Sequence, residues 1–195
     1  MKKEKVIDLR LNELPQLFNS LDATPFPETD LDADAEEFLM SWALEMNMHA
    51  DTSIRIKIHL KKPPTLDILT AQDQTQTAVQ NFFDYRADVV RRRLHRLLAR
   101  GRTSLLIGIT FLICTLLGAH VVDEYANKGK EDGNENPFYS IIRESLVIGG
   151  WVSMWGPLEI LLYDWWPIAQ ERKVCLRLAQ AKVDIVDLST RNLPA

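Results

Sequence analysis

The sequence is poor in the residues that metal centres and disulfide scaffolds require. Among 195 residues there are two cysteines, Cys114 and Cys175, and four histidines. One cysteine lies in an apolar stretch and the other in a charged one, and no Cys-x-x-Cys or cysteine–histidine spacing is present. Zinc sites and disulfide frameworks depend on such spacings. The sequence therefore predicts no metal, no cofactor and no disulfide framework.

Motifs of the common enzyme classes are missing as well. The chain has no G-x-S-x-G, no phosphate-binding loop, no glycine-rich nucleotide turn and no H-E-x-x-H. Asp30, Asp32 and Asp34 have the spacing of a calcium loop, but Ala35 replaces the glycine and Ser41 the final glutamate. A helix N-terminal cap explains this stretch better. We therefore expect a non-enzymatic protein without catalytic residues.

Charged residues are absent from residues 104–122, although they are frequent on either side. These 19 residues, SLLIGITFLICTLLGAHVV, would extend roughly 28 Å as a helix, close to the ~30 Å of a bilayer's hydrocarbon core. A second apolar run ends in Tyr163, Trp165 and Trp166, which are typical of a membrane interface. The sequence predicts two transmembrane helices, at 103–122 and 144–164.

Basic residues gather at one end of both predicted helices. The segment between the helices has two lysines against five acids, and four basic residues follow the second helix. By the positive-inside rule, both termini are cytoplasmic and the loop is outside. The formal net charge of −4 and this juxtamembrane position argue against nucleic acid as a partner. The basic residues expected to contact anionic lipid headgroups are Arg91, Arg92, Arg93, Arg96, Arg100 and Arg102.

Small residues on the two predicted spans favour close packing of the pair. Gly108 and Gly118 fall on roughly one face of the first span, and Gly149 and Ser153 on one face of the second. We expect these four residues to hold the two helices together. Contacts with other subunits are the alternative.

Glu159 is a carboxylate well inside the second predicted span. It precedes the first interfacial tryptophan by six residues, which places it about 9 Å deeper along a helix. A charge at this depth is costly unless it is paired, protonated or hydrated. Three interpretations stay open: pairing with Arg100 or Arg102, a neutral carboxyl group, or a pathway for a cation or proton. Pro157 and Gly156 predict a kink beside it, so these three residues are membrane-embedded functional candidates.

Alternation of apolar and polar residues predicts three short strands outside the spans. VIDLRL at 6–11 and SIRIKIHL at 53–60 alternate, and so does KVDIVDLS near the C-terminus. If the third strand joins the first two, the membrane segment is an insertion between strands of one sheet.

Two further helices are predicted on the cytoplasmic side. One starts near Asp32 or Asp34 and turns Phe38 and Trp42 to the same side. The other covers 71–102 and leads towards the first span. Its apolar positions, which mostly follow a four–three spacing, are Val79, Phe83, Val90, Leu94 and Leu97.

Together these patterns predict an α+β membrane protein with a small cytoplasmic α/β domain, a long juxtamembrane helix and a two-helix transmembrane hairpin. The predicted segments are a cytoplasmic α/β region (1–70), an amphipathic basic helix (71–102), transmembrane helix 1 (103–122), an outer, periplasmic loop (123–143), transmembrane helix 2 (144–164) and a cytoplasmic tail with a helix and a strand joining the N-terminal sheet (165–195).

Several stretches resemble a group of uncharacterised bacterial inner-membrane proteins of about 200 residues. They are PFPETDLDADAEEFLMSWA, IRIKIHL, FFDYRADVVRRRLHRLLARGRTSLLIG and ESLVIGGWVSMWGPLEILLYDWWPIAQER. The resemblance implies two spans, cytoplasmic ends and a bacterial inner (plasma) membrane, and it brings no activity and no site residue. Calcium uniporter channels look similar in arrangement only. The selectivity motif of those channels has an aspartate and a glutamate-proline pair at the outer start of the second span. Here Pro157 instead precedes Glu159, near the cytoplasmic end, so calcium conduction is not expected.

The sequence thus favours a non-enzymatic accessory or scaffold protein of the inner membrane. Its expected partners are a bilayer with anionic headgroups and either further copies of the chain or other subunits of a membrane complex. The alternative is an oligomeric ion or proton pathway that uses Glu159.

Overall fold

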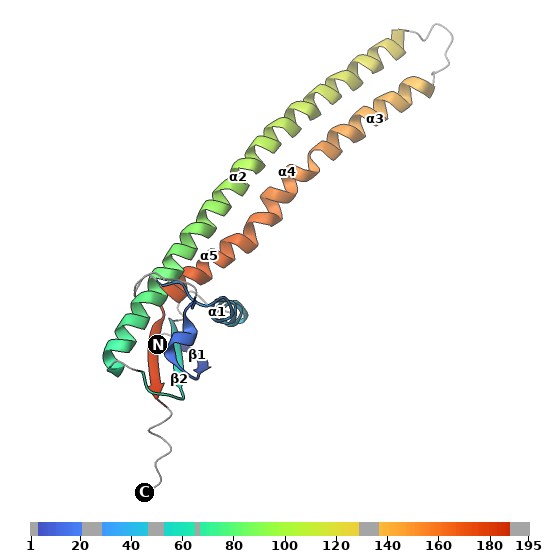
Figure 1. Ribbon diagram of the computed structural model, residues 1–195. Helices are drawn as coiled ribbons and strands as arrows, with labels where there is room; N and C mark the ends of the chain where they lie inside the picture. Colours follow the sequence, from blue (N-terminus) through green and yellow to red (C-terminus); the bar gives the residue numbers. More distant parts are fainter. Residues whose placement is uncertain (1–3, 21–28, 47–52, 65–66, 129–136, 188–195) are drawn as a thin grey trace. The chain divides into compact units, whose positions relative to one another are not determined.

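The computed structural model describes residues 4–20, 29–46, 53–64, 67–128 and 137–187. The chain divides into two compact units. One, the α/β unit, combines Met1–Arg91 with Ala169–Ala195, and the other, the helical unit, is Arg92–Ile168 (Figure 1). The α/β unit is therefore assembled from both ends of the chain, with the helical unit inserted between them.

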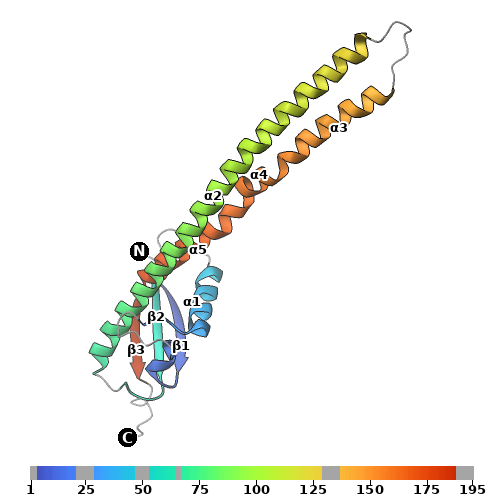
Figure 2. The same cartoon turned by 45° about the horizontal axis from the view of Figure 1, so that its top comes forward.

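A three-stranded parallel sheet forms the centre of the α/β unit. Its strands are β1 (Glu4–Leu11), β2 (Ser53–Leu60) and β3 (Lys182–Asp187), in the order β1-β2-β3 (Figure 2). Successive side chains of a strand point to opposite faces, and alternate residues of β2 from Ile54 to Leu60 are buried. The three predicted strands are confirmed, and the C-terminal strand does join the N-terminal sheet.

Three helices contribute to the core on the apolar face of this sheet. They are α1 (Ala33–Glu45), the first turns of α2 (Ile68–Lys128) and the end of α5 (Trp165–Ala179). Leu39, Phe83 and Leu178, one from each helix, are fully buried in a single cluster with the strand residues. A short 3-10 helix, η1 (Leu14–Leu17), adds Leu17 to the same cluster. The α/β unit thus has a hydrophobic core of its own.

The start of α1 agrees with the cap predicted from sequence. The Asp32 side chain accepts a hydrogen bond from the backbone N–H of Asp34 at 3.0 Å. Phe38 and Trp42 lie on the same side of the helix as predicted, with their ring centroids 6.0 Å apart, although Trp42 is exposed and Phe38 is only partly buried. The buried stripe is formed by Ala35, Leu39 and Ala43, spaced by four residues. Small alanines let the helix approach the sheet closely and leave the indole at its margin.

Helix α2 is continuous from Ile68 to Lys128. The juxtamembrane helix was predicted to be divided from a separate transmembrane hairpin at residues 102–103. This division is wrong, because one continuous helix covers both parts. Gly101 lies within this continuous helix, in a close helix contact that favours the absence of a side chain. A Cβ added there would lie 2.8 Å from Cγ2 of Ile160.

The returning segment of the helical unit is broken into shorter pieces. It consists of α3 (Pro137–Ser153), α4 (Trp155–Glu159) and a π-helical segment, η2 (Ile160–Asp164), which leads into α5. Residues 123–143 were predicted as a loop, but α2 continues to Lys128 at the start of this segment and α3 begins at Pro137 near its end. Within the described residues, two helices, Ile68–Ala126 and Pro137–Ala179, are long and apolar enough to cross a membrane.

Candidate functional site

Three glycines bring α2 and α3 close together within the helical unit. A Cβ at Gly108 would lie 3.1 Å from Sδ of Met154, and one at Gly118 would lie 3.5 Å from Leu146. Gly150 is more tightly enclosed, because a Cβ there would overlap the Thr115 hydroxyl. Residue numbers increase along α2 as they decrease along α3, so these two helices pack antiparallel.

The remaining small residues of α3 and α4 are placed differently. The Ser153 hydroxyl donates to the carbonyl of Gly150 in its own helix at 2.6 Å, and it lies 3.5 Å from the carbonyl of Gly108 on α2. Gly149 and Gly156 have no neighbouring atom within 4 Å of an added Cβ. The residue at the helix contact is thus Gly150 rather than Gly149. One residue rotates the position by 100° around a helix, which decides which of two adjacent glycines faces the partner.

The helix is irregular between Met154 and Asp164. Proline has no backbone N–H, so Pro157 leaves the carbonyl of Ser153 without its helical partner. A turn at Met154 separates α3 from α4, where the Met154 N–H donates to Trp151 at 3.1 Å. In η2, the indole N–H of Trp165 donates to the carbonyl of Leu161 at 2.9 Å. Short π-helical segments are frequent at functional sites.

Glu159 ends α4 directly before this π-helical segment. Its side chain is exposed, and in the described part of the chain no ion pair joins it to Arg100 or Arg102. Gly101 contacts Ile160, so both arginines lie at the same level of the helical unit as Glu159. Pro157 is buried and Gly156 is exposed. The structure therefore brings the three candidates together on one short segment, with the carboxylate directed outwards.

The arginine cluster lies on one continuous stretch of α2. All six side chains are exposed, and none forms an ion pair with another described residue. The cluster therefore presents six uncompensated positive charges to its surroundings. Its members are Arg91, Arg92, Arg93, Arg96, Arg100 and Arg102.

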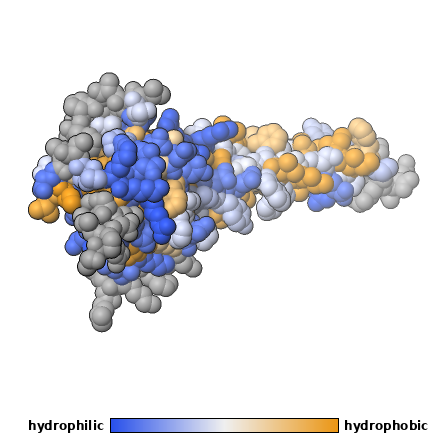
Figure 3. All heavy atoms as spheres, turned by 60° about the horizontal axis from the view of Figure 1, so that its bottom comes forward, coloured by the Kyte–Doolittle hydropathy of each residue, from blue (hydrophilic) through white to orange (hydrophobic). Residues whose placement is uncertain are grey.

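Large apolar side chains cover much of the helical unit. Trp155 is 75% exposed, and Leu106 and Ile107 are about two-thirds exposed. In the most apolar stretches of the two long helices, 17% and 11% of the residues are buried. In Figure 3, orange side chains lie on the surface along the helices, whereas blue dominates the part of the α/β unit in view.

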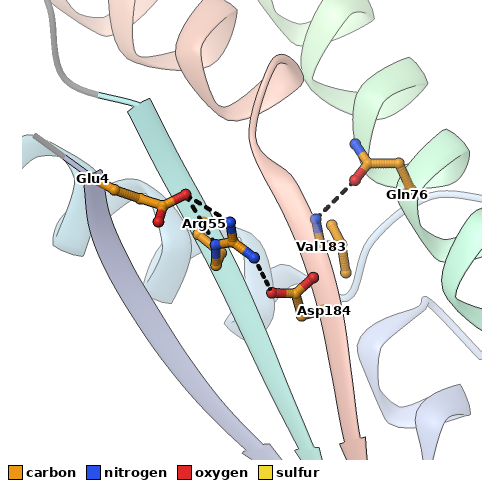
Figure 4. A network of polar contacts seen from close by, with 5 residues as sticks. All are labelled: Glu4, Arg55, Gln76, Val183 and Asp184. Carbon is orange, nitrogen blue, oxygen red and sulfur yellow. Dashed lines mark hydrogen bonds and ion pairs between the residues drawn. The ribbon is translucent and has the colours of Figure 1, made fainter. Parts of the chain in front are cut away.

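The open face of the sheet carries a network centred on Arg55 of β2. Its guanidinium lies 2.6 Å from the carboxylate of Asp184 on β3 and 2.9 Å from that of Glu4 on β1 (Figure 4). The hydrogen bond with Asp184, followed by that with Glu4, raises the pKa of Arg55. A second cross-strand pair joins His59 and Asp8 at 2.9 Å. These pairs connect all three strands across the side that no core helix covers.

Cys175 lies in the core of the α/β unit. It is fully buried, with its sulfur 3.9 Å from that of Met40. Burial, with a further contribution from the charge of Glu171, raises the pKa of the thiol to about 11. A neutral thiol is a poor nucleophile and a poor metal ligand. In the described residues no group of three or more histidine, cysteine, aspartate or glutamate side chains is arranged to hold a metal ion.

One polar contact was not anticipated from the sequence. Gln76 of α2 bonds through its side-chain amide to the backbone of residues 181 and 183 at the start of β3. Its only sequence signal is the recurrence of glutamine at every fourth residue in Gln72, Gln76 and Gln80.

Comparison of the chain with family models, curated proteins and solved structures finds no match.

Proposed function

We propose that the chain is a non-enzymatic scaffold or accessory protein anchored in a membrane by its helical unit. The observation that carries this proposal is the exposure of the apolar stretches of both long helices. The apolar core helix of a soluble protein is mostly buried, whereas these stretches are 17% and 11% buried. An apolar surface of this extent is unfavourable in water and favourable in lipid. On this proposal the α/β unit stays in water and is the part presented to partners.

The charges support one orientation. Six exposed arginines precede the first apolar stretch, and each basic residue near an anionic surface contributes about 1 kcal/mol to membrane binding. On this basis both termini are cytoplasmic and the segment between the long helices is outside. The exposed rings of Tyr163 and Trp166 suit the headgroup region on the arginine side. With the resemblance noted above, the bacterial inner membrane is the proposed location.

Cys114 provides a direct test of the membrane placement. It is exposed and lies in the middle of the first apolar stretch, while Cys175 is buried in the α/β unit. In a Cys175→Ser variant, we expect Cys114 in intact membranes to be protected from a charged maleimide and to be labelled once the membrane is dissolved and the protein unfolded. A matched control carries Ser41→Cys, at an exposed position of α1, in a background without both native cysteines. Equal labelling of Cys114 and of the thiol introduced in α1 in intact membranes would overturn the proposal.

The accessory role has its own test. The full chain is purified in a mild detergent, and the mass and composition of the particle are determined. A different protein recovered in fixed stoichiometry supports an accessory role, and several copies of the chain alone support a homo-oligomeric scaffold. A chain that is monomeric and without a partner contradicts both.

A second candidate function is a pathway for an ion or proton. The observation that favours it is the exposed carboxylate of Glu159, which lies between the π-helical segment and Pro157. Pro157 leaves the carbonyl of Ser153 without its helical partner. Glu159→Gln is expected to abolish flux in proteoliposomes while leaving assembly intact. Asp164→Asn, about one helical turn further towards the interface, is the matched control. Unchanged flux in Glu159→Gln excludes this candidate and leaves the scaffold role.

A further inference from the structure

Arg100 and Glu159 are opposite charges at the same level of the helical unit. Gly101 contacts Ile160, so the residues that directly precede these two lie about 3 Å apart along the helix axes. Both charged side chains are exposed, and neither forms an ion pair with another described residue. The charge-free stretch begins at Ser104, directly beyond this level. A carboxylate at the edge of an apolar surface that faces lipid is costly unless it is paired.

Both charges point to the same side of the helix pair. Each directly precedes a residue of the contact between α2 and the returning segment, and one residue turns a helix by 100°. Because the two helices are right-handed and antiparallel, one step back from the contact leads to the same side on both. Arg100 and Glu159 therefore point side by side rather than at each other. This direction agrees with the absence of an ion pair between them in the described part of the chain.

Ile107 and Gly156 continue this side into the apolar stretch. They directly precede Gly108 and Pro157, which meet in the helix contact: a Cβ at Gly108 would lie 3.4 Å from Cγ of Pro157. Ile107 is exposed, and a Cβ added to Gly156 would meet no atom within 4 Å. The surface called the Glu159 side from here on is formed by Arg100, Ile107, Gly156 and Glu159.

The opposite side of the helix pair has a different composition. It is formed by the residues one step after the same contacts. At the level of the charges these are Arg102 and Leu161, and further along the returning segment Leu158 takes the place that Gly156 has on the Glu159 side. Of the two sides, the Glu159 side is therefore the one that presents a cation and an anion at one level, beside a position without a side chain.

We propose that the Glu159 side binds a second copy of the chain, in a dimer whose two-fold axis runs along the helices. Rotation about this axis keeps every residue at its level and turns the Glu159 sides of the two copies towards each other. Arg100 of each copy then faces Glu159 of the other, so the interface contains two reciprocal ion pairs, as a two-fold interface requires. Gly156 lies opposite Ile107 of the other copy, where a glycine lets membrane helices approach closely.

Charge complementarity favours a second copy over lipid as the occupant of this side. Anionic headgroups attract Arg100 but repel Glu159, whereas the same side of a second copy pairs both charges at once. The inference rests on the proposed membrane anchor and deepens it, because it names a second copy of the chain as the partner of the helical unit. It also gives Glu159 a structural partner, which is the alternative to a role in an ion or proton pathway.

Disulfide formation between two differently tagged copies tests the geometry. One full-length copy carries Ile107→Cys and the other Gly156→Cys, both in a background without the native cysteines, and they are expressed together. On mild oxidation of the membranes we expect a covalent heterodimer, because these two positions face each other across the interface. Since each copy has a single cysteine, no disulfide can form within one chain. The matched control replaces Gly156→Cys by Leu158→Cys, on the opposite side, and is expected to give at least tenfold less heterodimer.

Exchange of the two charges between copies tests the ion pairs. Glu159→Arg and Arg100→Glu, each expressed alone in two tagged forms, are expected to reduce co-purification of the tags in mild detergent at least tenfold, because like charges then face each other. Expressed together, the two variants form both ion pairs again with reversed signs, and co-purification should return to within twofold of the original chain. The matched control is Arg102→Glu, at the same level on the opposite side. It should associate normally by itself and fail to restore association to Glu159→Arg.

The dimer is overturned if no covalent heterodimer forms, if Leu158→Cys gives as much of it as Gly156→Cys, or if the two charge-reversed variants do not restore association to each other. The last outcome would mean that the charges pair within one chain or with lipid. The disulfide experiment needs no charged substitution, so it decides alone if a charge-reversed variant is missing from the membrane fraction. Labelling of Cys114 in intact membranes overturns the membrane anchor itself, whereas protection of Cys114 without a covalent heterodimer overturns only the dimer.

Discussion

The two units of this chain use similar residues in opposite ways. In the α/β unit, Ile56 and Phe83 are almost completely buried, whereas in the helical unit Leu106 and Trp155 are mostly exposed. The first arrangement follows from burial of apolar surface away from water, at roughly 25 cal/mol per Å². The second arrangement, with large apolar side chains exposed, is unfavourable in water. On the proposal that the helical unit lies in a membrane, the two units of the chain face two different solvents.

The largest expected difference between the units comes from truncating one apolar side chain in each. Phe83→Ala leaves a cavity in a closed core, and we expect it to cost about 3–5 kcal/mol of stability in the α/β unit. Leu106→Ala removes a side chain that is 67% exposed and is expected to leave that unit unchanged. Denaturation in detergent, followed by hydrogen exchange of the β2 amides, measures both. Equal effects of the two substitutions would contradict the comparison.

The second prediction concerns two adjacent glycines in the helical unit. Gly150→Ala introduces a methyl group against Thr115 and Leu112, and overpacking of this kind typically costs about 1–3 kcal/mol. Gly149→Ala meets no neighbouring atom, and it is expected to be neutral or stabilising by up to ~1 kcal/mol. Melting temperature in detergent and hydrogen exchange of α3 give the readout. A destabilised Gly149→Ala would show that this face is covered by another helix.

The third prediction uses the Cys175 thiol as a reporter of the α/β core. With its pKa raised to about 11 by burial, roughly one thiol in a thousand is ionised at pH 8, so iodoacetamide is expected to react only after unfolding. The folded state holds the thiol proton more tightly than the unfolded state, so protonation of Cys175 favours folding. This contribution to the free energy of unfolding is complete below about pH 9. It is lost as the pH rises from about 9 to about 11. Met40→Ala, which loosens the packing at the sulfur, should accelerate the reaction.

The smallest expected effect concerns the ion pairs on the open face of the sheet. Arg55→Met is expected to lower the melting temperature of the α/β unit by a few degrees at most, because partly exposed ion pairs contribute little. The difference should shrink at about 1 M salt, where charges are screened within ~3 Å. Arg55→Lys is the matched control, since it keeps the charge and loses the fork that reaches both Glu4 and Asp184. A loss that does not depend on salt would indicate packing by the arginine stem instead.

The strands were predictable because their alternation is a strong local signal. In β2 each apolar residue from Ile54 onwards is buried and each intervening residue is not, as the sequence indicates. The orientation of α1 was not predictable from residue size. Trp42 looks like a core residue, yet the sheet is approached by Ala35 and Ala43, and the choice depends on how closely the helix can pack.

In the helical unit, too, the sequence does not decide which face of a helix packs against its neighbour. Its glycines indicated close packing, but Gly149 and Gly150 are adjacent, and only the rotation of the helix decides which one contacts α2. The role of Gln76 depends on a strand more than a hundred residues later in the chain, so no local pattern identifies it.

The order of the strands has a consequence for how the chain is made. The central strand β2 ends at Leu60, and its neighbour β3 begins only at Lys182. During synthesis the ribosome must release the chain as far as β3 before the sheet gains its third strand. Until then one side of β2 stays open to unwanted pairing, and the long helices have already emerged. Completion of the sheet is therefore a late step in biogenesis, and chains interrupted before residue 182 are expected to be recognised by chaperones and proteases as unfinished.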